Sequence, residues 1–403
     1  MEGTLGSAGQ RRIPARYVLF GVVAVVLIFG AVSAPGAKSS RPTRDDDVIA
    51  TLPARNTAEA RELAQLRRRA AEAPLDLEKA LALAQRYIES ARRTADPRDL
   101  GAAEATLAAW TKQTDPPSAV RLLRATILQS RHDFDAALID LDSVLKETPD
   151  DAQALLTRAT VWTVKGNYDE ARKSCTQLAP LVSHAYAVAC TAPLDMLTGA
   201  GDRAGAALAG ALSTSRSPAE RSLLHSIAGE QAYWLGAMAE GERHLRAALQ
   251  LDPDDRYSRA VYADLLLDAA RYDEARALLA AHETDDALAL RLALVDLARG
   301  VHDGSAERRV ADNFAASRLR GDAVHRREEA RLWLARGDAQ KALRCALESF
   351  RVQREPWDAR LVLESAQAAR RPEAAGDVVA WLDAHHFAAP QMRAREANLR
   401  GRP

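Results

Sequence analysis

The sequence predicts an all-α protein built from repeated helical hairpins, and three observations lead to this fold class. The chain has 403 residues, which is too long for one ordinary core and calls for several domains or one elongated array. Aromatic residues make up only 5% of the chain and apolar residues 47%, so the apolar content is mostly Ala, Leu and Val. This mixture favours helices and disfavours an all-β fold. Similar segments also recur with a period of about 34 residues.

Two prolines give the register of the repeat. Pro149 and Pro253 lie 104 residues apart, close to three periods, and each follows an amphipathic pair of segments. Five stretches align in this register: Leu122 to Asp150, Leu155 to Leu178, Leu223 to Asp255, Tyr257 to His282, and His325 to Pro356. We therefore expect a helical hairpin in each of the five stretches.

Constant offsets within these stretches carry small residues, which let two helices cross closely. In the first helix they are Ala125, Ala159, Gly229, Ala263 and Ala330, and in the second Ala137, Ala171, Gly241, Ala275 and Ala342. Between the helices stand Gly166, Gly236 and Gly337. Glycine readily adopts the positive φ that ends a helix, and a neighbouring Asp or Asn caps the next one.

This pattern resembles the tetratricopeptide repeat. The resemblance implies an all-α solenoid of seven to nine hairpins over residues 57–388, wound as a right-handed superhelix with the first helices lining its concave face. Weaker copies are expected at 58–110, 186–212, 288–316 and 361–382, with Pro193 kinking or breaking its helix. Residues 389–403 are expected to form a C-terminal tail.

An apolar segment precedes the repeats. Residues 17–32 contain no charge, and extension through Ser33 and Ala34 reaches the minimum of about 17 residues that a membrane span needs. It follows a short basic tail, 1–16, and precedes a Pro- and Ser-rich linker, 35–56. We favour an uncleaved anchor forming one N-terminal apolar helix. A cleaved signal is the alternative, although Pro35 would stand just after the cut.

The flanking charges predict the orientation of the chain. Arg11, Arg12 and Arg16 precede the span and three aspartates follow it at 45–47, which favours a cytoplasmic N-terminus and a repeat array outside the cytoplasm. Abundant Ala and Arg are typical of a bacterial protein. The prediction is a periplasmic or other extracytoplasmic array that is membrane-anchored, or secreted if the leader is cleaved.

Several functional classes are disfavoured by the sequence. Lys and Arg number 55 and so do Asp and Glu, which argues against a nucleic-acid binder. The chain contains no phosphate loop, HExxH pair, GxSxG elbow or CxxC pair, so we predict no enzyme and no cofactor. Of the nine histidines only His385 and His386 are adjacent, and neighbouring helical residues diverge, so no metal is expected.

Cys175 and Cys190 lie on either side of an expected turn near residues 181–182, at similar heights on two antiparallel helices. Two alternatives are open. In an oxidising compartment they form a disulfide, or they are two small buried thiols, the alternative that we favour.

The resemblance also implies where a partner would bind. Ligand contacts in such repeats come from the exposed side of the first helices, and aromatic surface beside acceptors suits a peptide or a partner helix. The candidates are Leu156, Thr160, Glu230, Tyr233, Trp234, Tyr257, Asp264, Asp268, Arg327 and Arg331. We predict a non-catalytic, membrane-tethered interaction scaffold that binds a protein or peptide on its concave face. The alternatives are an accessory subunit of an envelope enzyme or transport system, or a secreted repeat protein.

Overall fold

The computed structural model describes residues 57–94, 96–283, 285–302, 304–320, 325–387 and 389–399. The expected basic tail, apolar segment and linker, residues 1–56, lie outside these ranges. The chain divides into two compact units, Met1–Ala60 and Arg61–Pro403, and the fold described below is that of the second.

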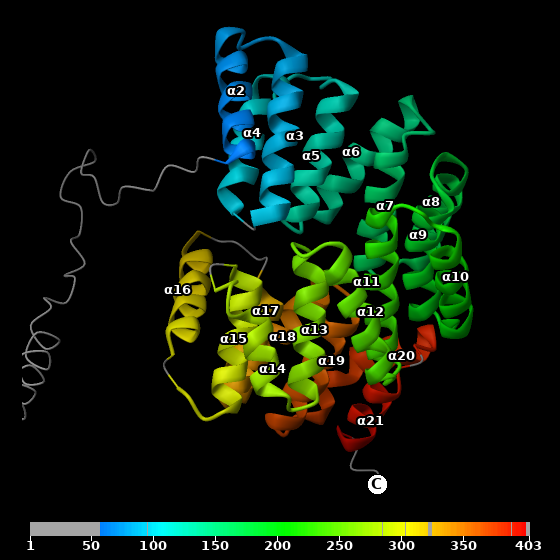
Figure 1. Ribbon diagram of the computed structural model, residues 1–403, viewed down its shortest axis with the longest axis vertical. Helices are drawn as coiled ribbons and strands as arrows, with labels where there is room; N and C mark the ends of the chain where they lie inside the picture. The colour runs from blue at the N-terminus through cyan, green and yellow to red at the C-terminus, as the bar shows by residue number, and fades with distance from the viewer. Residues whose placement is uncertain are drawn as a thin grey trace, which may run out of the picture. The chain divides into compact units, whose positions relative to one another are not determined.

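All regular structure in the described residues is helical (Figure 1). The elements are α2 Ala58–Glu72, α3 Leu77–Thr94, α4 Pro97–Thr111, α5 Ser118–Ser130, α6 Phe134–Glu147, α7 Ala152–Val164, α8 Tyr168–Leu178, η1 Ala179–Leu181, α9 His184–Leu197, α10 Gly201–Thr214, α11 Pro218–Trp234, α12 Met238–Leu251, α13 Arg256–Asp268, α14 Tyr272–Leu279, α15 Asp286–Ala298, α16 Ser305–Arg320, α17 Arg326–Ala335, α18 Ala339–Val352, α19 Pro356–Ala368, η2 Pro372–Ala375, α20 Gly376–His385 and α21 Pro390–Leu399.

Within the described ranges, α3 to α20 pair as nine consecutive hairpins. The first helix of each hairpin also packs on the first helix of the next, from α3 on α5 through to α17 on α19. The predicted array of helical hairpins is therefore confirmed, including the weaker copies at 58–110, 186–212, 288–316 and 361–382.

The small residues of the repeat lie where the two helices of a hairpin touch. The five first-helix positions and the five second-helix positions are all buried. The tightest crossing joins α11 and α12, where a Cβ added to Gly229 would come within 2.6 Å of Leu245 Cγ. A Cβ added to Gly241 would come within 3.1 Å of the carbonyl oxygen of Gly229. The close packing of helices therefore explains this part of the repeat pattern.

A left-handed residue ends the first helix of most hairpins. Gly236 takes this position after α11 with φ of 80°, as the sequence predicts. After α13 the same position belongs to Ala270, with φ of 54°, although alanine is strained there because its Cβ crowds the carbonyl. Asn167 and Asp338 cap the following helices through the amides of Glu170 and Lys341, at 3.3 Å and 3.1 Å.

Two local expectations need correction. Pro193 lies inside α9, and the helix runs on to Leu197 without a break. Its neighbours Ala192 and Leu194 are buried, so packing outweighs the lost backbone hydrogen bond. The segment expected to be a C-terminal tail contains α21, which packs on α19 and buries Met392.

Cys175 of α8 and Cys190 of α9 are joined by a disulfide bond, the alternative that we favoured less. Their Cα atoms lie 5.7 Å apart, within the usual range for such a bond. Cys345 carries a free thiol and is half-buried.

Among the helices of the described ranges, none is both long and apolar enough to cross a bilayer. The segment 17–34, on which the prediction of an anchor rests, was not part of that set.

The left-handed turns give a test of the fold. Replacing Ala270 by Gly should raise the free energy of unfolding by up to about 1 kcal/mol. The Cβ atom of Ala270 strains the left-handed backbone and, because it is exposed, contributes little packing in return. Gly236→Ala should lower it by about 1 kcal/mol, since the site has open space but φ of 80°. Urea unfolding of both variants beside the parent chain provides the measurement. Equal, unchanged midpoints would contradict these turn conformations.

Candidate functional site

The C-terminal helices α17 to α21 contact the first helices of the central hairpins. Trp357 of α19 stacks on Tyr233 of α11 with ring centroids 5.9 Å apart, and its edge meets Trp234 at 5.3 Å. Tyr233 and Trp234 are both fully buried. The aromatic residues that the sequence offers for a partner therefore pack against the chain's own C-terminal part.

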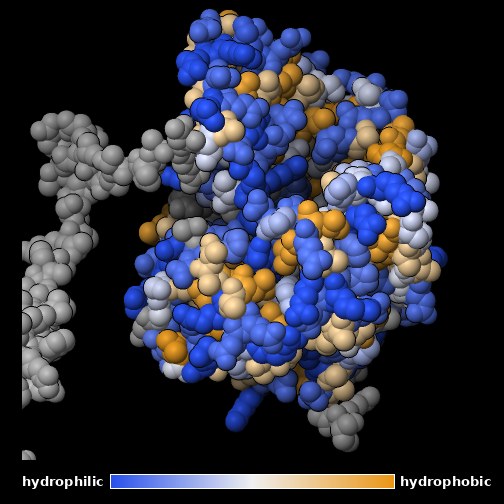
Figure 2. Space-filling model, in the orientation of Figure 1, coloured by the Kyte–Doolittle hydropathy of each residue, from blue (hydrophilic) through white to orange (hydrophobic). Residues whose placement is uncertain are grey.

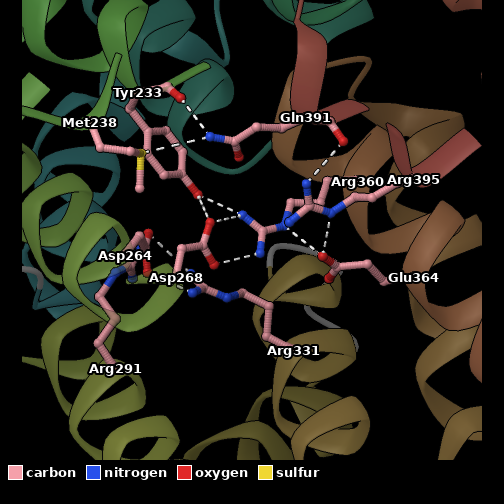
Figure 3. Close-up of polar contacts among 10 residues, drawn as sticks. All are labelled: Tyr233, Met238, Asp264, Asp268, Arg291, Arg331, Arg360, Glu364, Gln391 and Arg395. Carbon is pink, nitrogen blue, oxygen red and sulfur yellow. Dashed lines mark hydrogen bonds and ion pairs between the residues drawn. The ribbon is translucent and has the colours of Figure 1, made fainter. Parts of the chain in front are cut away.

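A buried aspartate joins three of these first helices (Figure 3). Asp264 of α13 accepts hydrogen bonds from Arg291 of α15 at 2.7 Å and from Arg331 of α17 at 2.6 Å. The Asp264 side chain has no solvent exposure. Burial acts to raise the pKa of Asp264, but the two guanidinium groups outweigh it and hold that pKa below its ordinary value.

A second aspartate lies one helical turn further along α13. Arg360 of α19 donates two hydrogen bonds of 2.7 Å to the carboxylate of Asp268. The hydroxyl of Tyr233 donates to the same carboxylate at 2.7 Å. Bidentate pairing of this kind is the strongest form of Arg–carboxylate contact. Burial raises the pKa of Tyr233 well above its ordinary value, so this hydroxyl stays a donor.

The last helix, α21, extends the same set of contacts. Gln391 donates to the backbone carbonyl of Tyr233 at 3.0 Å. Arg395 binds Glu364 at 2.7 Å, and Glu364 also accepts from Arg360 at 2.8 Å. We call the whole set the inner-face network, which comprises Tyr233, Asp264, Asp268, Arg291, Arg331, Arg360, Glu364, Gln391 and Arg395.

Two arginines of the C-terminal helices lie over the ring of Trp357. The guanidinium carbon of Arg331 lies 4.6 Å from its ring centroid and that of Arg360 lies 4.8 Å away. Each cation thus contacts both a carboxylate and an aromatic ring. These contacts stabilise charges that would otherwise be costly to bury.

Further contacts attach the C-terminal helices to α7 and α8. The backbone amide of Arg354 donates to the carbonyl of Val164 at 2.7 Å, and the indole of Trp381 donates to the hydroxyl of Tyr168 at 3.2 Å. The side chain of Gln353 meets His132, which follows α5, at 3.1 Å. The C-terminal helices therefore bridge several central hairpins.

A second polar group lies beside the network. Arg327 of α17 binds Asp358 at 2.9 Å and also pairs with Glu355. Glu230 accepts from the hydroxyl of Tyr257 at 2.5 Å and from the indole of Trp234 at 3.4 Å. Burial raises the pKa of Glu230, so this carboxylate sits in a poorly hydrated place.

The ten candidate residues thus fall into groups. Asp264 binds Arg331, and Tyr233 binds Asp268. Glu230 accepts hydrogen bonds from both Trp234 and Tyr257. Arg327 is bound to Asp358, which is not among the candidates. Leu156 and Thr160 lie on α7, where the hydroxyl of Thr160 donates to the backbone carbonyl of Leu156. Neither side chain forms a hydrogen bond to the other candidate residues in the part of the chain that the structure describes. Tyr257 is 57% exposed and Leu156 is 38% exposed.

Sequence reasoning missed Arg291, Trp357, Arg360, Glu364, Gln391 and Arg395. Most of these belong to C-terminal copies in which the repeat pattern is weak. A signal was present nevertheless, because Arg360 stands between Ala359 and the apolar run 361–363, and a charge embedded in this way indicates a buried partner.

Among the residues that the structure describes, no group of three or more His, Cys, Asp or Glu side chains could hold a metal ion. The network pairs the carboxylates of Asp264, Asp268 and Glu364 with arginines, and these pairs join helices that are distant in sequence.

Comparison with known proteins gave likeness in structure alone. No protein-family model and no curated protein matches this sequence. The APC/C hetero-tetramer Cut9–Hcn1 matches at 15% identity with a TM-score of 0.43, over 76% of this chain and 52% of that one, so the match spans about half of that protein. A tetratricopeptide repeat protein from Parabacteroides merdae matches at 19% identity with a TM-score of 0.37, over 70% of this chain and 98% of that one.

A third similar structure is the human IFIT1 dimer with m7Gppp-AAAA. It matches at 13% identity with a TM-score of 0.47, over 85% of this chain and 86% of that one. At these identities and scores, none of the three bears on the function of this chain.

Loss of the charge on Asp264 should destabilise the fold strongly. Asp264→Asn leaves Arg291 and Arg331 buried without their counter-ion, so the free energy of unfolding should fall by about 3–5 kcal/mol. Asp273→Asn is the matched control, because Asp273 is 90% exposed and pairs only with Arg299 among the recorded ion pairs. It should change stability by less than about 1 kcal/mol. Similar losses from both variants in urea unfolding would contradict the network.

The contact of His132 with Gln353 predicts a dependence on pH. Burial lowers the pKa of His132, so the folded protein binds fewer protons than the unfolded chain as the pH falls below about 6.5. The free energy of unfolding should therefore decrease between pH 7 and pH 5, and His132→Gln should reduce that decrease. Urea unfolding at several pH values measures it, and an unchanged slope in the variant would be evidence against a buried, neutral His132.

Proposed function

We propose that this protein is a non-catalytic interaction scaffold that binds a peptide or helix of a partner protein. The observation that carries the proposal is the exposure of two large side chains on first helices, Leu156 of α7 at 38% and Tyr257 of α13 at 57%, where neighbouring hairpins could have buried them. Exposed apolar and aromatic side chains suit recognition of an extended segment or helix.

The inner-face network narrows the surface that a partner can use. Tyr233, Trp234 and Asp264 are buried beneath α17 to α21, and a partner would have to displace these helices to reach them. The contacts that we propose are therefore Leu156, Thr160 and Tyr257, with Glu230 as the acceptor beside them. The network holds the first helices at constant spacing and so prepares this surface before binding.

We further propose that the repeat array lies outside the cytoplasm, tethered through residues 17–34. Two observations support this location: the basic residues before the apolar segment, and the disulfide between Cys175 and Cys190. A reporter that is active only outside the cytoplasm, fused after Pro403, should be active in cells. Activity of a cytoplasmic reporter alone would refute the location.

Two alternatives retain the repeat array but differ in its partner or in its location. If the chain serves as an accessory subunit of an envelope enzyme or transport system, its bound partner should be that enzyme or transporter. If it is secreted, the mature chain should lack residues 1–34, and the intact mass of the mature protein distinguishes this alternative from an anchor.

Site-specific crosslinking tests the binding surface. A photoactivatable residue at position 257 or 156 should give one and the same crosslinked partner in cells. At position 139, where Ile139 on the second helix α6 is 72% exposed, the residue should not give that product. Tyr257→Ala should weaken binding of the isolated partner at least tenfold, a loss of about 1.4 kcal/mol. The proposal fails if position 139 yields the same product as efficiently.

A further inference from the structure

Two histidines face each other across the hairpin of α11 and α12, outside the inner-face network. The Nδ1 atoms of His225 and His244 lie 2.9 Å apart, and the ring planes are tilted by 43°. Both side chains are part-buried, and that of His244 keeps 21% exposure. Both rings thus direct the same nitrogen at one point that solvent can still reach.

The backbone holds the two rings in this arrangement. Gly229 and Gly241 form the close crossing of the hairpin, and each lies about one helical turn from one histidine. A side chain at either glycine would meet its neighbour within 3.1 Å, so the two helices cannot approach in this way with larger residues. The spacing of the histidines therefore comes from the backbone and is present before any ligand arrives.

The facing nitrogens of the two rings are the atoms that can act as ligands. At 2.9 Å one Nδ1–H donates to the other Nδ1, so the pair holds a single proton there, and its removal leaves two lone pairs on neighbouring nitrogens. The carboxylate of Glu240 lies 3.8 Å from Nε2 of His244. This distance is too long for a hydrogen bond, and a small shift of the exposed Glu240 side chain would let it accept the Nε2–H and orient the ring of a metal-binding histidine.

We propose that His225 and His244 together bind one late first-row divalent cation, Cu²⁺ most strongly, through their Nδ1 atoms. Two metal–nitrogen bonds of about 2.0–2.1 Å that meet near a right angle place the nitrogens about 3 Å apart, close to the spacing found here. The single proton shared between the facing nitrogens moves to the outer nitrogen of the ring that held it, and the other ring already has its proton on its outer nitrogen, so both rings stay neutral. Water fills the remaining positions, because the described residues offer no third ligand in the same group.

The bound cation would link α11 to α12 through one histidine ligand on each helix. Because the unfolded chain separates the two histidines by 19 residues, the cation binds the folded hairpin in preference and raises its stability. The preference for Cu²⁺ over Ni²⁺ and Zn²⁺ follows from the usual order of affinity for nitrogen ligands.

Electron paramagnetic resonance of the Cu²⁺ complex tests the site. The full chain in detergent, purified without a histidine tag, should bind one Cu²⁺ with hyperfine coupling to two imidazole nitrogens. His225→Gln and His244→Gln should each lose one of these nitrogens and at least tenfold in affinity. Glu240→Gln should weaken binding about tenfold with both nitrogens retained. His184→Gln, at an exposed histidine on α9, is the matched control and should bind as the parent chain does.

Two results would overturn the proposal. One is a Cu²⁺ spectrum of the parent chain without two-nitrogen coupling, which decides the matter even if a variant fails to fold. The other is a double variant, His225→Gln with His244→Gln, that folds by circular dichroism and binds Cu²⁺ as tightly as the parent. A rise in melting temperature with Ni²⁺ that both single variants abolish would support it independently.

Discussion

Two carboxylates of α13, the fully buried Asp264 and the partly exposed Asp268, hold the C-terminal helices against the central first helices. Their arginine partners come from residues up to 92 positions further along the chain. A repeat array usually makes contacts only between neighbouring hairpins, and its stability is close to a sum of such contacts. Here the C-terminal helices also contact the central first helices through Asp264 and Asp268. Removing Asp264 leaves buried arginines without a counter-ion, so one side chain affects contacts between distant hairpins.

This packing of the C-terminal helices decides which side chains of the first helices stay exposed. The aromatic residues Tyr233 and Trp234 stand on a first helix, yet Trp357 covers them and the network surrounds them. Leu156 of α7 and Tyr257 of α13 stay exposed, at 38% and 57%.

The hairpins could be predicted from sequence because their signals are local. Ala159 and Ala171, or Gly229 and Gly241, lie within one hairpin and report a close helix crossing through spacing alone. The network could not be predicted in the same way. Asp264 and Arg331 are 67 residues apart, and no periodicity links them. Their embedding in apolar stretches indicated burial, but only the folded chain identifies the partner. The helix at 390–399 was missed for the same reason, since its contacts to Tyr233 and Glu364 join residues 158 and 31 positions apart.

A double-mutant cycle on Asp268 and Arg360 tests this packing of the C-terminal helices most directly. The unfolding free energies of Asp268→Ala, Arg360→Ala and the double variant are measured against the parent chain under identical conditions. The account predicts a coupling energy of at least about 1.5 kcal/mol, because the two side chains share two hydrogen bonds and the Arg360 side chain is 9% exposed. A coupling energy that does not differ from zero would mean that α19 does not pack on α13, and the account would have to be abandoned.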